Sequence, residues 1–289
     1  MTPSEHTVEA NGLKHHIIVW EADGPTVLLA HGLLDIAWSW KLVAERLQAE
    51  GYRCVAWDWR GHGETEHIGA GGFYHFPDYV LDLEELLPQL RRGPDDAVHL
   101  VGHSMGGTAA AMFAGVRSRE LRSLTLVEGL GPKTHDFDGT PLKFERWLDQ
   151  MVQLRADVRT SPYPMQIPQA LARMRVHNPE LPEELGLMLA EKSTRPVPGG
   201  RAWRYDRKHW VTSPMPFRRE IFDAFLGRIE VPTLVVMGER GFRLPDEKER
   251  YACLRRGRFV EIADVGHMIH WLAPQALADH IAAFIASGR

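Results

Sequence analysis

The pentapeptide Gly102-His103-Ser104-Met105-Gly106 constrains this chain more than any other feature of its sequence. It has the form G-x-S-x-G, in which glycines stand on both sides of a serine at a sharp turn from a strand into a helix. An apolar run at 97–101 precedes it and an alanine-rich stretch at 108–114 follows it, which predicts the strand and the helix. A turn of this kind presents its serine to a reacting group, so Ser104 is the candidate nucleophile.

A serine hydroxyl becomes a good nucleophile only when a histidine accepts its proton and a carboxylate holds that histidine in the correct tautomer. His267 is the first candidate for this base, because it follows the strand-like run 258–262 and Gly266 permits a tight turn before it. His270, three residues later, is the alternative base. Most of the fifteen histidines are expected to have structural roles, including His99 in a buried strand.

Two further motifs complete a resemblance to the α/β-hydrolase family of the cap-bearing kind. His31-Gly32-Leu33-Leu34-Asp35 follows an apolar strand and is similar to the family's His-Gly loop, and Asp58-Trp59-Arg60-Gly61-His62-Gly63 is similar to another family loop. The resemblance extends over essentially the whole chain. It implies an α/β fold with a mostly parallel, eight-stranded sheet flanked by helices and an inserted, mainly helical cap. It also implies an oxyanion hole made by the backbone N–H groups of Leu33 and Met105.

The chain departs from the family pattern at the acid of the triad. Most members carry an aspartate after the seventh strand, where this chain has Gly241 after the run 233–240. In a subset that includes the serine hydrolase-like proteins and many haloalkane dehalogenases, the acid stands at the end of the sixth strand. Glu128 follows the corresponding run 123–127. The resemblance therefore implies Glu128 as the triad acid.

Other acidic residues remain alternatives to Glu128, which would then simply end a strand. They are Glu239, Asp246, Glu247 and Asp264. Epoxide hydrolases and dehalogenases of this fold use a nucleophilic aspartate. Because position 104 is a serine, neither epoxide nor halide chemistry is expected.

The alternation of strands and helices indicates one discontinuous core, 1–131 and 217–289, with a cap at 132–216 where helical stretches are separated by prolines. Large side chains in the cap and after the His-Gly loop are candidates for binding an apolar acyl or alcohol group, although packing is the simpler role for each. These candidates are Trp38, Trp147, Met151 and Trp210. The segment 202–210 is rich in aromatic and charged residues, so it either lines the entrance or anchors the cap.

Composition narrows the classes of partner. A net charge of −4 over 289 residues gives no general attraction to nucleic acid or to an anionic membrane. The N-terminus lacks the charged start and apolar run of a secretion signal, and no window has eighteen uninterrupted apolar residues, so a cytoplasmic protein without a membrane segment is expected. No cofactor and no metal are expected, since His62, Glu64 and His67 lack the helical spacing of a metal site.

The combined prediction is a hydrolase of small to medium carboxylic esters that forms an acyl-enzyme on Ser104. His267 is the predicted base and Glu128 the predicted orienting acid. The same residues would serve a thioesterase, a lactonase or a carbon–carbon bond hydrolase, because the triad does not select the acyl group. A non-catalytic ligand-binding member of the fold is the alternative from another class, suggested by the missing acid at Gly241. The sequence does not indicate an oligomeric state.

Overall fold

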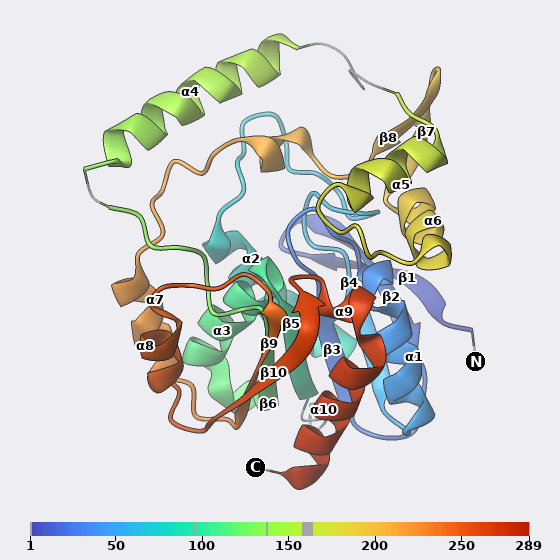
Figure 1. The fold of residues 1–289 in the computed structure, drawn as a ribbon, viewed down its shortest axis with the longest axis vertical. Helices are drawn as coiled ribbons and strands as arrows, with labels where there is room; N and C mark the ends of the chain where they lie inside the picture. The colour runs from blue at the N-terminus through green and yellow to red at the C-terminus, as the bar shows by residue number, and fades with distance from the viewer. Residues whose placement is uncertain (1, 95, 97, 137, 158–163, 289) are drawn as a thin grey trace.

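An eight-stranded sheet forms the centre of the protein (Figure 1). We describe a computed structural model of residues 2–288, apart from 95, 97, 137 and 158–163. The strand order is β1-β2-β4-β3-β5-β6-β9-β10. β2 runs antiparallel to both of its neighbours, and the other neighbouring pairs are parallel. The predicted α/β fold with a mostly parallel sheet is confirmed, although Ala97, at the start of one predicted strand, lies outside the described residues.

The inner strands of this sheet are mostly buried, as parallel strands are when helices cover both faces, whereas the edge strands are more exposed. The strands are β1 (Ser4–Ala10), β2 (Leu13–Trp20), β3 (Thr26–Ala30), β4 (Arg53–Trp57), β5 (Val98–His103), β6 (Leu121–Val127), β9 (Thr233–Arg240) and β10 (Gly257–Gly266). All residues of β3 and β5 are buried. The burial of both faces explains why these strands are continuous apolar runs rather than alternating ones.

Helices cover both faces of the sheet (Figure 1). One face packs against α2 (Phe76–Leu90), α3 (Met105–Arg117) and α7 (Arg219–Leu226) through a large apolar cluster. The other face packs against α1 (Lys41–Ala49) and α10 (Pro274–Ser287) through a second cluster. The short elements are η1 (Ala37–Trp40), η2 (Ser118–Glu120), α8 (Glu247–Ala252) and α9 (Ile269–Leu272). Among the described residues, no helix combines the length and the apolar character needed to cross a lipid bilayer.

The chain between β6 and α7 lies outside the sheet. It contains α4 (Thr140–Ala156), α5 (Ile167–Arg175), α6 (Glu183–Lys192), β7 (Thr194–Val197), β8 (Gly200–Trp203) and η3 (Arg207–Trp210). The hairpin β7–β8 differs from the expected helical content. Its turn is made by Pro198 and Gly199, and Gly199 has a positive φ. A third apolar cluster joins α5 and α6 to Ile36 and Trp271, whereas α4 lies apart from α5 and α6 (Figure 1).

Parallel strands place their carboxyl ends at one edge of the sheet, where α/β proteins bind ligands. The segments that follow β3, β4, β5, β6 and β10 carry the residues singled out by the sequence motifs. The fold therefore brings five separate stretches of chain to the same edge.

His99 on β5 is a buried structural histidine, as expected. Its side chain is buried, and Nδ1 is 2.8 Å from the Ser123 hydroxyl on β6. Burial, reinforced by the charge of Arg122, lowers the pKa of His99 to about 4. A histidine that stays neutral in the fold but takes up a proton when unfolded destabilises the fold as the pH falls.

We expect the His99→Gln variant to lose less stability on acidification than the wild type. Between the ordinary histidine pKa near 6.5 and the folded value of about 4, the unfolded state binds more protons at His99, so the free energy of unfolding falls with pH in this window. Urea unfolding at a series of pH values measures the slope. Other titrating groups, among them the buried His16 with its raised pKa, are the same in both proteins, so the difference between the two slopes isolates His99. Equal slopes would contradict the assignment.

Candidate active site

Ser104 occupies a strained turn between β5 and α3. Its backbone has φ 51° and ψ −115°, a region that residues other than glycine rarely adopt. The Ser104 N–H donates to the Val127 carbonyl on β6 at 2.9 Å, which holds the turn. The flanking glycines are required by close contacts: a Cβ at Gly102 would lie 2.6 Å from the Gly106 carbonyl oxygen, and one at Gly106 only 2.4 Å from that of His31.

Glu128 follows β6 and reaches His267, which follows β10. Its side chain is completely buried, and Oε2 lies 3.0 Å from His267 Nδ1. The carboxylate also accepts backbone hydrogen bonds from Gly238 (2.7 Å) and Phe242 (2.6 Å). A buried carboxylate needs such donors, since burial without them is costly. With Nδ1 directed at Glu128, Nε2 of His267 is the nitrogen left to exchange a proton.

The glycine at 241 and the glutamate at 128 are parts of one arrangement. A Cβ on Gly241 would lie 2.0 Å from Glu128 Oε1 and 2.6 Å from its carboxyl carbon. The glutamate carboxylate thus fills the space into which a side chain at 241 would project. The absence of an acid at Gly241 is therefore what the position of Glu128 requires.

Three of the four alternative acids, Glu239, Asp246 and Glu247, have carboxylates that are engaged elsewhere. Glu239 Oε2 accepts the Asp264 N–H at 2.9 Å, Asp246 Oδ2 lies 3.0 Å from Arg250 Nη2, and Glu247 Oε1 lies 2.7 Å from Arg243 Nη2. In the described part of the chain, the carboxylate in contact with the His267 ring is that of Glu128.

The alternative base, His270, is also engaged elsewhere. It is fully buried with Nε2 3.0 Å from Asp35 Oδ2, whereas the side chain of His267 is 36 % exposed. The more exposed histidine is the better placed of the two to meet a substrate.

The two amides of the predicted oxyanion hole come from two separate segments at this edge of the sheet. Leu33 belongs to the loop after β3, and Met105 begins α3. Neither backbone N–H donates a hydrogen bond within the residues that the structure places. The loop lies close to the nucleophile: a Cβ on Gly32 would lie 3.2 Å from Ser104 Cβ. Unpaired N–H groups beside a serine are what an oxyanion hole needs, and these two remain its predicted donors.

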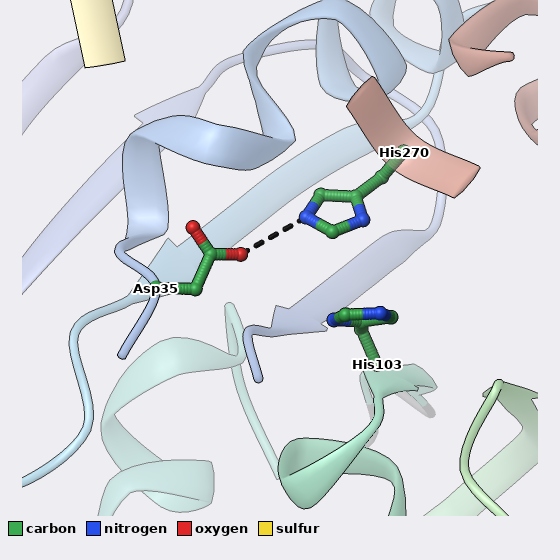
Figure 2. Close-up of side chains that lie close together, drawn as sticks. All are labelled: Asp35, His103 and His270. Carbon is green, nitrogen blue, oxygen red and sulfur yellow. Dashed lines mark hydrogen bonds and ion pairs between the residues drawn. The ribbon is translucent and has the colours of Figure 1, made fainter. Parts of the chain in front are cut away.

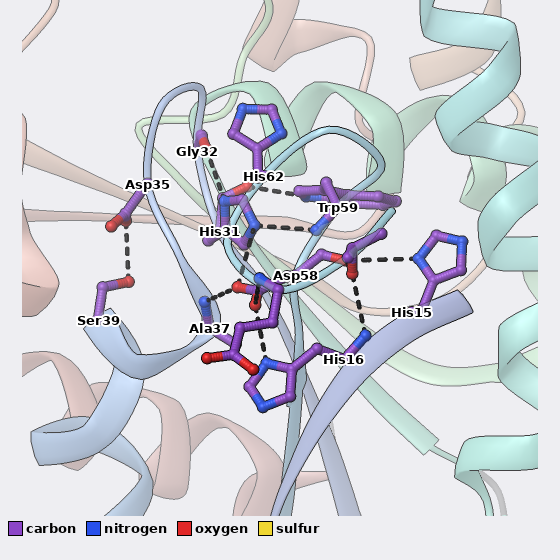
Figure 3. A network of polar contacts seen from close by, with 12 residues as sticks. His15, His16, His31, Gly32, Asp35, Ala37, Ser39, Asp58, Trp59 and His62 are labelled. Carbon is purple, nitrogen blue, oxygen red and sulfur yellow. Dashed lines mark hydrogen bonds and ion pairs between the residues drawn. The ribbon is translucent and has the colours of Figure 1, made fainter. Parts of the chain in front are cut away.

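A buried carboxylate, Asp58, fastens the loop after β3 to the loop after β4 (Figure 3). Asp58 accepts the Ala37 N–H at 2.7 Å and lies 2.8 Å from His16 Nδ1. His31 Nε2 accepts the Trp59 N–H at 3.0 Å. Burial alone would raise the pKa of Asp58, but the hydrogen bond and the charge of His16 hold it below its ordinary value. The ionised Asp58 therefore holds Ala37, the residue at which the chain leaves the His-Gly loop.

Asp35, His103 and His270 form a second buried cluster, in which one ligand-type atom from each lies within 4.8 Å of the others (Figure 2). His270 contacts Asp35, and its ring lies 4.4 Å from that of His103. His103 Nε2 donates to the His267 carbonyl at 3.0 Å. Burial lowers the pKa of His103 well below its ordinary value, so this histidine is neutral. The cluster joins the loops after β3, β5 and β10, which carry Leu33, Ser104 and His267.

The four candidate substrate-binding residues lie in different surroundings. Trp38 donates to Glu5 at 3.1 Å and packs edge-on against Trp20. Trp147 packs edge-on against Phe73 at 5.9 Å, and Met151 is the buried side chain of α4. Trp210 is 67 % exposed and lies beside Tyr205. The structure does not bring these four together.

Two contacts of the site were not predicted. His103 occupies a variable position of the G-x-S-x-G motif, so its hydrogen bond to His267 has no sequence signal. Phe242 donates its N–H to Glu128, and its half-exposed ring packs edge-on against His267 at 6.3 Å. The only sequence signal for Phe242 is its position directly after the glycine that replaces the usual acid.

The comparisons with known proteins agree with this fold. A family model described as the alpha/beta hydrolase fold matches residues 25–274. A serine hydrolase-like protein of Danio rerio is 25 % identical over 279 residues, which cover 92 % of this chain and 83 % of that protein. An epoxide hydrolase of Siraitia grosvenorii is 35 % identical over 125 residues, 43 % of this chain and 38 % of that protein.

A solved thioesterase domain from the curacin biosynthetic pathway superposes with a TM-score of 0.84 and 29 % sequence identity, over 98 % of this chain and 100 % of that domain. The relatives named above are hydrolases by description, and the family model spans most of the chain. The resemblance that the motifs indicated is confirmed: this protein belongs to the α/β-hydrolase fold family, and along most of its length it is similar to serine hydrolase-like proteins.

Proposed function

We propose that the protein is a serine hydrolase that cleaves small to medium carboxylic esters. The observation that carries this proposal is the 3.0 Å contact between the buried Glu128 carboxylate and His267 Nδ1, at the edge of the sheet where Ser104 stands on its strained turn. An oriented histidine at the same edge of the sheet as a partly exposed serine is the arrangement that we propose to activate the hydroxyl for attack on an acyl carbon.

In the proposed reaction, Ser104 Oγ attacks the ester carbonyl while His267 Nε2 takes the hydroxyl proton. The negative charge on the carbonyl oxygen is stabilised by the Leu33 and Met105 N–H groups. His267 then gives its proton to the departing alcohol, which leaves an acyl group on Ser104. Water attacks this ester with His267 again as the base, and the acid is released. Glu128 keeps the histidine in the productive tautomer and stabilises it when it is charged.

We assign a covering role to the chain at 132–216. The packing of α5 and α6 against Ile36 and Trp271 holds this chain over the carboxyl edge of the sheet. Trp147 and Met151 on α4 are proposed to contact an apolar part of the substrate, with Trp38 and Trp210 as outer contacts. A cover of this kind excludes water and favours apolar acyl groups.

Thioester hydrolysis is the second candidate, because the superposed thioesterase domain covers the whole of this fold at 29 % identity. The proposed steps apply unchanged to a thioester, with a thiol as the leaving group. A larger kcat/KM for an acyl thioester than for the oxygen ester of the same acid would favour this candidate. Epoxide opening is not proposed, since Ser104 stands where that chemistry uses an aspartate.

Ser104→Ala is expected to abolish ester hydrolysis. Loss of a serine nucleophile costs about 10⁴- to 10⁶-fold in kcat in serine hydrolases. The assay is hydrolysis of p-nitrophenyl esters from acetate to decanoate, together with labelling of the wild type by a fluorophosphonate. Ser213→Ala, at an exposed serine, is the matched control and should behave as wild type. If no ester is hydrolysed and Ser104 resists the probe, the non-catalytic alternative replaces this proposal.

Glu128→Gln is expected to lower kcat by about 10³- to 10⁴-fold with the fold intact, because a neutral amide neither holds the tautomer nor stabilises the charged imidazole. Glu239→Gln makes the same chemical change at the end of β9 and should leave kcat near the wild-type value. Steady-state kinetics with circular dichroism measure both effects. The assignment is wrong if Glu128→Gln is as active as wild type while Glu239→Gln or Asp246→Asn is inactive.

Gly241→Ala is expected to impair the site without any change to the proposed triad. The added methyl group would overlap Glu128 Oε1, which must move, and a displacement of about 1 Å at a catalytic group can cost roughly 10²-fold. Gly93→Ala, where a Cβ would meet nothing within 4 Å, is the control. Equal kcat values for the two variants would show that the carboxylate position is not critical.

A further inference from the structure

The loop that carries the predicted oxyanion donor is a tight turn with an unusual residue in it. The Asp35 N–H points to the Gly32 carbonyl at 3.4 Å, so Leu33 and Leu34 are the central residues of the turn. Leu34 has φ 61°. Positive φ at the third residue is typical of a type II turn, where glycine is usual. A leucine in this conformation needs support from outside the turn.

His62, from the loop after β4, provides that support. Its Nε2 accepts the Leu34 N–H at 3.1 Å, and its Nδ1 donates to the Arg60 carbonyl at 3.1 Å. Both ring nitrogens are thus used, and the tautomer is fixed. The ring is fully buried. Burial, with the neighbouring His209 and His31, lowers the pKa of His62 well below its ordinary value, which keeps Nε2 an acceptor.

The segment 204–210, which precedes α7 in the chain, also contacts His62. The His209 ring lies 4.0 Å from that of His62 and stacks on Tyr74 at 3.9 Å. Asp206 accepts a hydrogen bond from the Tyr74 hydroxyl at 2.8 Å and donates its own N–H to the Gly61 carbonyl at 2.7 Å. A Cβ on Gly61 would lie 2.2 Å from the Tyr74 hydroxyl and 2.7 Å from His209 Nε2, so the segment fits against a glycine.

We propose that His62 is a positioning residue for the oxyanion hole and that His209 couples the docking of the segment 204–210 to it. Two peptide groups meet at Leu33: the one before it carries the Leu33 N–H, and the one after it carries the Leu34 N–H. His62 holds the later group, so the earlier group can rotate relative to it only through the dihedral angles of Leu33. The stack of His209 fixes His62, so the covering chain helps to orient the N–H that stabilises the oxyanion. This role rests on the proposed function.

The test compares His62→Phe with His62→Gln. Phenylalanine keeps a flat ring for the stack but offers no acceptor, whereas the glutamine side-chain oxygen can accept the Leu34 N–H. His62→Phe is expected to lower kcat for p-nitrophenyl acetate by about 10- to 100-fold, less than or equal to the loss of a whole oxyanion donor, with little change in KM. His62→Gln is expected to recover most of that kcat. His99→Phe and His99→Gln control for changes at a buried neutral histidine remote from the loop.

A second readout does not depend on activity. Amide hydrogen exchange of Leu34, measured by NMR, should be slow in the wild type and in His62→Gln, and fast in His62→Phe. It separates this proposal from the proposed function, because an inactive wild type with a His62-protected Leu34 amide would contradict only the function. Equal exchange in all three proteins, or equal loss of kcat in both His62 variants, would overturn the positioning role.

The coupling to the covering chain has its own variants. His209→Phe keeps the stack on Tyr74 and should keep kcat near the wild-type value. His209→Ala removes the stack and should lower kcat and accelerate Leu34 exchange, both less than His62→Phe does. Wild-type kinetics and exchange in His209→Ala would show that the segment only anchors the chain and does not orient the loop.

Discussion

The buried carboxylate of Glu128 is the interaction on which the rest of the site depends. In the sheet, β9 lies between β6, which Glu128 follows, and β10, which His267 follows. The Glu128 side chain must therefore cross the end of β9 to reach His267. It does so by accepting hydrogen bonds from Gly238 on β9 and from Phe242 just beyond it. These two donors compensate the burial of the charge and aim the remaining lone pair at His267. The side chain of glutamate is one methylene longer than that of aspartate, and Gly241 has no side chain in its path, so this crossing is possible.

Backbone strain at two adjacent strand ends sets the direction of two side chains of the proposed triad. Ser104 has φ 51° and Glu128 has φ 52°, and such conformations cost about 1 to 3 kcal/mol each in residues other than glycine. Each is held by the next strand: the Ser104 N–H donates to Val127, and the Glu128 N–H donates to Val236, both at 2.9 Å. The hydrogen bonds between parallel strands therefore continue one residue past β5 and β6. At these residues, Ser104 and Glu128, the side chain turns out of the sheet toward its carboxyl edge.

The sequence predicted the fold and the positions of Ser104, His267 and Glu128 because these depend on local patterns: an apolar strand, a glycine-flanked turn and the order of motifs. It did not predict what joins the loops. The contact of His103 with His267 and that of His62 with Leu34 link segments 164 and 28 residues apart, and neither has a local signature. The segment 202–210 left two roles open, and the contacts of Asp206 and His209 favour the anchor. The substrate contacts stay predictions, because Trp38 and Trp210 were chosen on no pattern beyond their size.

Buried histidines connect the loops at the carboxyl edge of the sheet to one another. His31 and His62 lie between the loops after β3 and β4, and His103 and His270 lie between the loops after β3, β5 and β10. Burial lowers the pKa of His31, His62 and His103, so these three serve as neutral donors and acceptors rather than as charges. Neutral rings can pack against one another without charge repulsion, while both nitrogens of His31 and His62 and Nε2 of His103 hydrogen-bond to backbone groups. Loops joined in this way hold their backbone amides in place without a ligand, which is the condition that the proposed oxyanion hole requires.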